Sequence, residues 1–181
     1  TYLPLAGVDS YPLMFFWVAK PDVPIISVTP SANRTYVGLS INVTVLAKNE
    51  GSTTETFNVM AKYNQSVAGT QTVANLAPGA NVMLIFTWKT AGVSAGNYVM
   101  SANASQVGGE VDLADNSLTD GIVRVKTPGD VNGDGSVNVF DAILLSANFG
   151  RPVEEFPDGD INGDGHINIL DGIIIMANWT G

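Results

Sequence analysis

A twelve-residue pattern that occurs twice near the C-terminal end constrains this chain more than any other feature. The copies span residues 130–141 and 160–171, and both keep Asp, Asn, Asp and Gly at positions 1, 3, 5 and 6. Asn and Asp follow at positions 9 and 12. This spacing lets a loop wrap a hard cation in oxygen ligands, and the glycine permits the sharp turn that the loop needs. The pattern therefore predicts two bound calcium ions.

Each loop is expected to use five side-chain oxygens and, at position 7, a main-chain carbonyl. His166, the lone histidine, holds position 7 of the second loop, so we expect its carbonyl to coordinate and its side chain to face solvent. Position 12 is Asp rather than Glu, and this shorter side chain requires a different loop geometry. Val137 and Ile167, at position 8, are expected to pair across a short antiparallel bridge. The predicted ligands are Asp130, Asn132, Asp134, Ser136, Asn138 and Asp141, then Asp160, Asn162, Asp164, His166, Asn168 and Asp171.

An apolar segment with helical periodicity follows each loop, whereas Pro and Gly precede it. The shared helical stripe consists of Phe140, Ile143, Leu144 and Ala147, repeated as Leu170, Ile173, Ile174 and Ala177. The predicted unit is a loop followed by a helix, without the entering helix of a full EF-hand. Duplicated units of this kind, with Asp at position 12, resemble the dockerin family across residues 129–180.

The dockerin resemblance implies a calcium-folded module that docks into a cohesin domain on another protein. In that family the partner surface lies on the helices and includes positions 10 and 11 of the loops. Here these partner-binding positions are Val139, Phe140, Ile169 and Leu170, which indicates an apolar footprint. The alternative is a purely structural calcium-stabilised cap without a partner. A calcium sensor is disfavoured because the unit lacks an entering helix that could swing.

Charge is unevenly distributed along the chain, whose formal net charge is −9. Residues 127–181 hold nine acids against one base, whereas residues 1–126 are close to neutral. An acidic chain is a poor partner for nucleic acid. The absence of cysteine excludes disulfides and thiolate metal sites. No apolar run approaches the length of a membrane span. We expect a secreted or cell-surface fragment of a larger exported protein.

The sequence pattern of residues 21–126 predicts an all-β domain. Apolar residues alternate with polar ones at 37–45 and 82–88, as expected for half-buried strands. Further strands are predicted at 25–29, 56–63, 67–73, 98–104 and 122–126. Seven short strands in about a hundred residues indicate an immunoglobulin-like β-sandwich. The predicted fold class is therefore mainly β with a small α module: a seven-stranded sandwich, then two calcium-binding loop-helix units at 127–181.

The sandwich also resembles the CARDB family of cell-surface domains. The segments that carry the resemblance are 48–51, 76–79 with the strand at 82–88, 96–98, and 110–125 with its Asp115-Asn116 pair. The resemblance implies a spacer or an adhesive stalk unit. An alternative function is binding of carbohydrate or a surface polymer, which would need exposed aromatic side chains. Trp88 is expected in the core instead, and Tyr98 could form a tyrosine corner.

The chain ends and joints complete the predicted domain organisation. Residues 1–20 resemble the closing segment of a NosD-like β-helix; the alternative expectation is a strand or loop that packs on the sandwich. Residues 126–129, with Pro128, form a joint short enough to fix the angle between sandwich and calcium module.

Function is expected to be non-catalytic. The only histidine lies in a cation loop, and the acids of the sandwich, such as Glu110 and Asp115, lie in turn-like or edge segments, so no nucleophile–base pair or carboxylate pair is recognisable. Five glycosylation sequons are available if the protein is exported: Asn33, Asn42, Asn64, Asn103 and Asn178.

Overall fold

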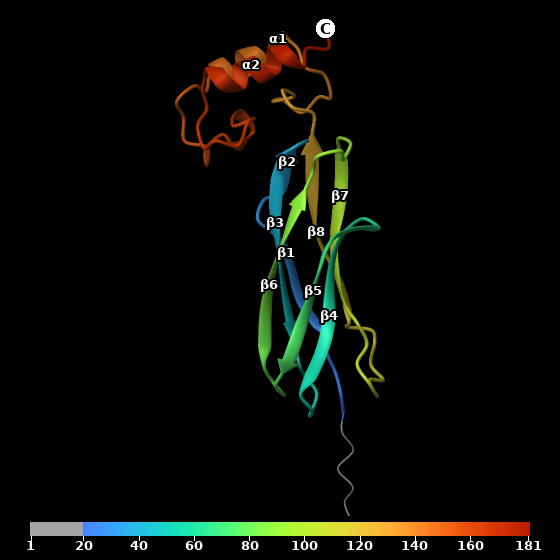
Figure 1. Ribbon diagram of the computed structural model, residues 1–181. Helices are drawn as coiled ribbons and strands as arrows, with labels where there is room; N and C mark the ends of the chain where they lie inside the picture. Colours follow the sequence, from blue (N-terminus) through green and yellow to red (C-terminus); the bar gives the residue numbers. More distant parts are fainter. Residues whose placement is uncertain (1–19) are drawn as a thin grey trace, which may run out of the picture.

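The computed structural model describes residues 20–181, which form a long β-sandwich with a small helical module at one end (Figure 1). The tail predicted at residues 1–20 lies, apart from Lys20, outside the described residues. The strands are β1 (Ile25–Pro30), β2 (Arg34–Tyr36), β3 (Ser40–Lys48), β4 (Glu55–Tyr63), β5 (Ser66–Leu76), β6 (Asn81–Lys89), β7 (Gly96–Ala104) and β8 (Ser117–Lys126). The helices are α1 (Val139–Ser146), the 3-10 turn η1 (Pro157–Gly159) and α2 (Ile169–Ala177).

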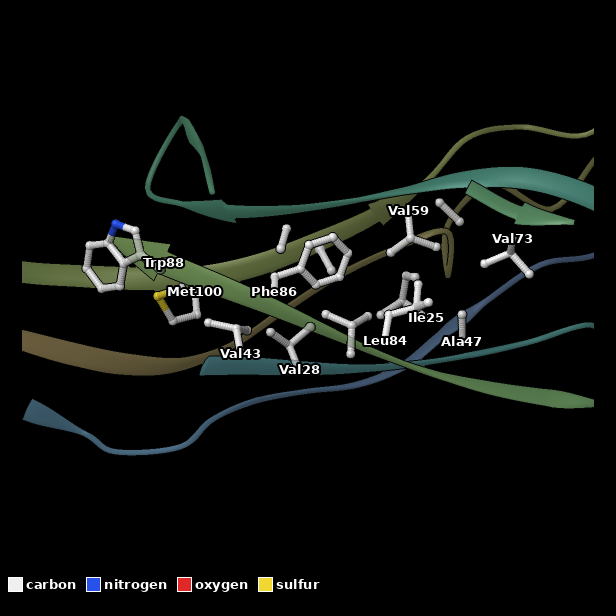
Figure 2. Close-up of a cluster of buried hydrophobic side chains, with 14 of the residues drawn as sticks. Ile25, Val28, Val43, Ala47, Val59, Val73, Leu84, Phe86, Trp88 and Met100 are labelled. Carbon is white, nitrogen blue, oxygen red and sulfur yellow. The ribbon is translucent and has the colours of Figure 1, made fainter. Parts of the chain in front are cut away.

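Two sheets make the sandwich. One has the order β1-β3-β6 and the other β2-β8-β7-β4-β5. In the first sheet, β3 and β6 pair antiparallel without a register shift, so that Val43 faces Phe86 and Val45 faces Leu84. All four side chains are buried between the sheets (Figure 2). The alternating pattern therefore predicted the correct inward face of both strands.

The sandwich class is confirmed, but the structure has eight strands rather than seven. The additional strand β2 pairs parallel with β8 at the domain junction, and three residues are too few to show an alternating pattern. The predicted strand at 37–45 was placed too early, because β3 begins at Ser40. Val37 belongs instead to a turn in which Gly38 has φ +97°, a conformation that glycine adopts without strain.

An aromatic cluster closes the end of the core nearest the module. Trp88 is only 1% exposed, as predicted, and Tyr63 stacks on it with ring centroids 4.7 Å apart. Tyr98 meets Trp88 edge-on at 5.4 Å. The Tyr98 hydroxyl donates to the carbonyl of Ser94 at 2.7 Å, four residues upstream, which is the expected tyrosine-corner contact. Trp88 therefore fills the core and offers no platform for a sugar.

The helical module shares its small core with the sandwich. Its buried side chains are Val131, Val137, Leu145, Ile161, Ile167 and Ile175, joined by Tyr36 of β2. Tyr36 is 3% exposed, and its hydroxyl donates to the carbonyl of Asp158 at 2.7 Å. Burial, followed by the charges of Asp158, Asp130 and Asp141, raises the pKa of Tyr36 above its ordinary value, so this hydroxyl stays protonated.

Basic side chains of β8 hold the first loop of the module. The Lys126 ammonium donates to the Val131 carbonyl and to Asp158 Oδ1, both at 3.0 Å. Arg124 donates to the Gly133 carbonyl at 2.6 Å. These contacts join the end of β8 to the first loop and to η1; that they fix the angle between the two domains stays a prediction.

Candidate functional site

In the first loop, carboxylate and amide oxygens fold the backbone around themselves. Asp130 accepts hydrogen bonds from the backbone N–H groups of Gly133 (2.8 Å) and Gly135 (3.2 Å). Asn132 Oδ1 accepts from the N–H of Asp134 at 2.9 Å. Gly135 has φ +93°, which supplies the sharp turn expected at position 6. The alternating residues at positions 1, 3 and 5 therefore lie in one compact loop.

The second loop repeats these contacts thirty residues later. Asp160 accepts from Gly163 at 2.8 Å and from Gly165 at 3.0 Å, and Asn162 accepts from Asp164 at 2.9 Å. The amide group of Asn162 also donates to Asp164 at 2.8 Å, as Asn132 does to Asp134 in the first loop. Two loops with one hydrogen-bonding pattern indicate two sites of the same chemistry.

Position 12 anchors each loop to its helix. Asp141 is fully buried, and its carboxylate accepts from the N–H groups of Asn132 (3.0 Å) and Asn138 (2.9 Å). Asp171, equally buried, accepts from Ile161 at 2.8 Å and from Asn168 at 2.9 Å. The helix N-terminus and these amide donors stabilise the buried charges in part. Because a buried carboxylate ordinarily needs a charged partner, the loops fit a bound cation.

Position 9 serves as the helix N-cap. Asn138 Oδ1 accepts from the N–H of Phe140 at 2.9 Å, and Asn168 Oδ1 accepts from Leu170 at 2.7 Å. Sequence reasoning assigned both residues to the cation alone and missed this second role. An amide oxygen has two lone pairs, so capping leaves one free for a metal or a bridging water. The assignment of Asn138 and Asn168 as ligands stays a prediction.

Position 7 has exposed side chains in both loops, Ser136 and His166. Their backbone N–H groups donate to Asp134 Oδ1 at 2.8 Å and Asp164 Oδ1 at 2.9 Å. Hydrogen bonds from Ser136 and then from Asn132 lower the pKa of Asp134, which favours the ionised form that a cation requires. The exposed His166 side chain agrees with coordination through its carbonyl.

The predicted bridge between Val137 and Ile167 is wrong. The Val137 carbonyl accepts from the N–H of Thr180, and the Ile167 carbonyl accepts from the N–H of Gly150, each at 2.9 Å. Each position-8 residue therefore pairs with the segment that follows the other unit's helix. Gly150 and Thr180 are also thirty residues apart, so the two hydrogen bonds are equivalent and link the two units in both directions. The side chains of Val137 and Ile167 are both buried.

No group of three or more acid, His or Cys side chains in residues 20–181 is placed to hold a metal ion by itself. A cation in either loop must therefore also use oxygens of Asn and of the main chain. These are the additional donors that a calcium loop supplies at positions 3, 7 and 9. The donor chemistry thus fits calcium rather than a metal held by nitrogen or sulfur.

The helices expose an apolar face. Phe140 and Ile169 are each 65% exposed. Leu145 and Ile175, which lie outside the predicted stripe, are the apolar side chains that the two helices bury. An apolar groove of about 380 Å³ runs between the helices and is lined by Ala142, Leu145, Ser146, Phe149, Ile169, Gly172, Ile173 and Met176. Sequence reasoning named only positions 10 and 11 of this face, although the repeated apolar spacing extended further. Neither α1 nor α2, the α-helices of the described part, has the length and apolar character of a membrane span.

The sequons differ in accessibility. Asn33, Asn42 and Asn64 are exposed, whereas Asn103 and Asn178 are half-buried. The amide nitrogen of Asn178 donates to the Ile174 carbonyl at 2.9 Å, and that of Asn103 donates to Ser117. Because a glycan is attached at this nitrogen, the first three sequons are the better candidates.

Two family models match the chain. Residues 20–117 match the CARDB family, and residues 128–178 match the dockerin type I domain. No curated protein matches.

Among solved structures, the chain is similar to the CARDB domain of a Pyrococcus furiosus protein, crystallised in complex with di-metal ions. Identity is 21% and the TM-score is 0.52, over 62% of this chain and 99% of that one. A cell-surface protein domain from Methanosarcina acetivorans gives 26% identity and a TM-score of 0.47, and the match covers 59% of this chain and 92% of that domain. A β-glucosidase from Erythrobacter marinus gives 14% identity and a TM-score of 0.46, and the match covers 58% of this chain but only 15% of the enzyme.

Proposed function

The chain belongs to the CARDB family and carries a dockerin type I domain, and we propose that it is an extracellular assembly unit that docks to a cohesin in a calcium-dependent manner. Both domains are of non-catalytic, cell-surface or docking types. The observation that carries the proposal is the exposed apolar face of α1 and α2, held above two loops whose oxygen donors suit calcium.

Calcium, when bound, would supply the positive charge that the loop carboxylates lack. We assign one ion to each loop, because the hydrogen-bonding pattern of Asp130 and Asp141 recurs at Asp160 and Asp171. The ligands would be the residues predicted from the sequence. The module buries only a handful of side chains, so ion binding would contribute much of its folding free energy.

The sandwich packs against the loops and leaves the docking face free. Gly133 lies against Arg124, and Gly163 lies against Leu39, so both position-4 glycines meet the sandwich side of the module. The helices lie on the far side of the module, at the tip of the molecule (Figure 1). This arrangement supports a spacer that presents the face of Phe140 and Leu170 outward.

A purely structural calcium cap on an adhesive sandwich is the alternative. The exposed large apolar side chains in the described part of the sandwich are aliphatic or Met, such as Met83 and Val67, rather than aromatic. Carbohydrate recognition by stacking therefore has little support. The concentration of exposed aromatic and branched side chains on the helical module favours docking to a protein.

Binding to immobilised cohesin domains, in calcium and in chelator, tests the proposal. The test variant carries Phe140→Ser and Leu170→Ser, which remove two exposed side chains of the face. The matched control carries Val67→Ser and Met83→Ser on the sandwich, which are 51% and 67% exposed. Burying each apolar side chain contributes about 1.5–3 kcal/mol, so the test variant should lose at least tenfold in affinity and the control little.

The outcome of the binding experiment separates docking to a cohesin from a purely structural calcium cap. Calcium-dependent binding that the face variant loses supports docking. A chain that binds calcium in both loops but retains no cohesin, across a panel and in capture from a native secretome, supports the structural cap.

A further inference from the structure

A second cluster of oxygen ligands lies at the opposite end of the sandwich from the helical module. Asp22 precedes β1, and Glu110, Asp115 and Asn116 lie in the connection between β7 and β8. Figure 1 shows that this connection and the start of β1 share the end of the sandwich farthest from α1 and α2. The cluster is therefore separate from the two loops.

Glu110 fixes the geometry of this cluster. Its side chain is buried, and Oε1 accepts from the backbone N–H of Val23 at 2.9 Å. Oε2 accepts from the backbone N–H of Val107 at 2.9 Å and from the amide group of Asn116 at 3.0 Å. Both Glu110 oxygens are thereby occupied, and the neighbouring Asp22 and Asn116 are held in place.

Three oxygens of this cluster are buried and accept no hydrogen bond from residues 20–181: Oδ1 of Asp22, of Asp115 and of Asn116. Asp22 and Asn116 are each only 5% exposed. Buried acceptors are almost always paired in folded proteins, so three in one cluster require an explanation. A cation or a donor from outside residues 20–181 is the simplest one.

Charge distinguishes a cation from a water molecule. Asp115 lies beside the carboxylates of Asp22, Asp112 and Glu110, whose negative charges act on it. Lys20 is the base that contacts the cluster; its ammonium lies 3.3 Å from Asp22 Oδ2 and its side chain is 65% exposed. A water molecule could satisfy the hydrogen bonds but would leave this repulsion between carboxylates, whereas a divalent cation relieves both.

We propose that Asp22, Asp115 and Asn116 bind one hard divalent cation, with calcium as the preferred ion. The three free donors are all oxygens, which favours calcium or magnesium over zinc or copper. Only two of them are carboxylates, in keeping with the lack of a three-acid metal cluster in residues 20–181. Carbonyl or water oxygens would complete the coordination. The ion would join the segment before β1 to the β7–β8 connection.

Counting bound calcium in the full chain tests this third site. Equilibrium dialysis at about 1 mM free calcium should give three ions for the unmodified chain, since the loops would hold two. Asp22→Asn with Asp115→Asn removes two carboxylate charges of the cluster and should reduce the count to two. Asp120→Asn with Glu154→Gln removes two exposed charges outside the cluster and the loops and should leave three.

A loop variant separates this inference from the proposed function. Asp134→Asn with Asp164→Asn should lose the two loop ions and keep the third. If the unmodified chain binds two ions and the loop variant none, the third site is refuted while the loop sites stand. A third ion that survives Asp22→Asn with Asp115→Asn also overturns the assignment. Hydrogen exchange of the Val23 and Val107 amides gives a second readout, because calcium should slow it in every chain that keeps Asp22 and Asp115, the loop variant included, and not in Asp22→Asn with Asp115→Asn.

Discussion

Breaking the ion pair between Lys126 and Asp158 should destabilise the fold by about 2–3 kcal/mol, although breaking most ion pairs on protein surfaces costs little. The Lys126 side chain is 4% exposed and that of Asp158 is 19% exposed, with 3.0 Å between Nζ and Oδ1. Lys48 and Glu50 form an equally short pair at 2.9 Å, but their side chains are 35% and 43% exposed. The protein thus contains its own matched control.

Removing either partner of the buried pair has a different cost. Asp158→Ala leaves the buried Lys126 ammonium with the Val131 carbonyl and the face of the Tyr36 ring, whose centroid is 5.3 Å away, but with no negative charge at Asp158. We therefore expect a loss of about 3 kcal/mol, the lower end for breaking a buried pair. Lys126→Met leaves Asp158 with Arg34 at 3.4 Å and partial solvation. Its cost is then chiefly the unpaired Val131 carbonyl, about 2 kcal/mol. Glu50→Ala, which breaks the exposed pair, should cost about 0.2–1 kcal/mol.

Urea unfolding in saturating calcium measures these differences. Trp88 reports on the sandwich core, and Trp179 lies at the end of the module, so fluorescence and circular dichroism together follow both domains. If Asp158→Ala costs no more than Glu50→Ala, the junction does not stabilise the folded chain and the reasoning from burial is refuted. The order Asp158→Ala above Lys126→Met above Glu50→Ala is the expected result.

Three further predictions concern single side chains. Leu145→Ala should cost about 2–5 kcal/mol because Leu145 is 1% exposed, whereas Ile173→Ala, at 58% exposed, should stay within about 0.5 kcal/mol; calcium-saturated thermal unfolding compares them. Asn138→Ala should lower the free energy of unfolding by about 1 kcal/mol through loss of the N-cap, and a stability equal to that of the unmodified chain would contradict the cap. Calorimetry of calcium binding to the same variant shows whether this oxygen also coordinates the ion. Tyr98→Phe should cost about 1 kcal/mol by removing the hydrogen bond to Ser94, and an unchanged urea midpoint would contradict it.

Local patterns determined much of this protein in advance. The duplicated loop spacing placed Asp130 and Asp160 in matching turns, because residues within twelve positions fold against their own backbone. Alternation of apolar residues gave the inward faces of β3 and β6 and the burial of Trp88, since successive side chains of a strand point to opposite faces.

Tertiary structure decided what depends on segments distant in the chain. The contact between Tyr36 and Asp158 joins residues 122 positions apart, and that between Val23 and Glu110 joins residues 87 apart. The first makes a sandwich residue part of the module's core, and the second gathers the unpaired oxygens around Asp22. Similarly, Leu145 rather than Phe140 is buried, because the facing unit determines which side of each amphipathic helix is covered. Periodicity fixes which residues share a face, but only packing between distant segments fixes which face meets water.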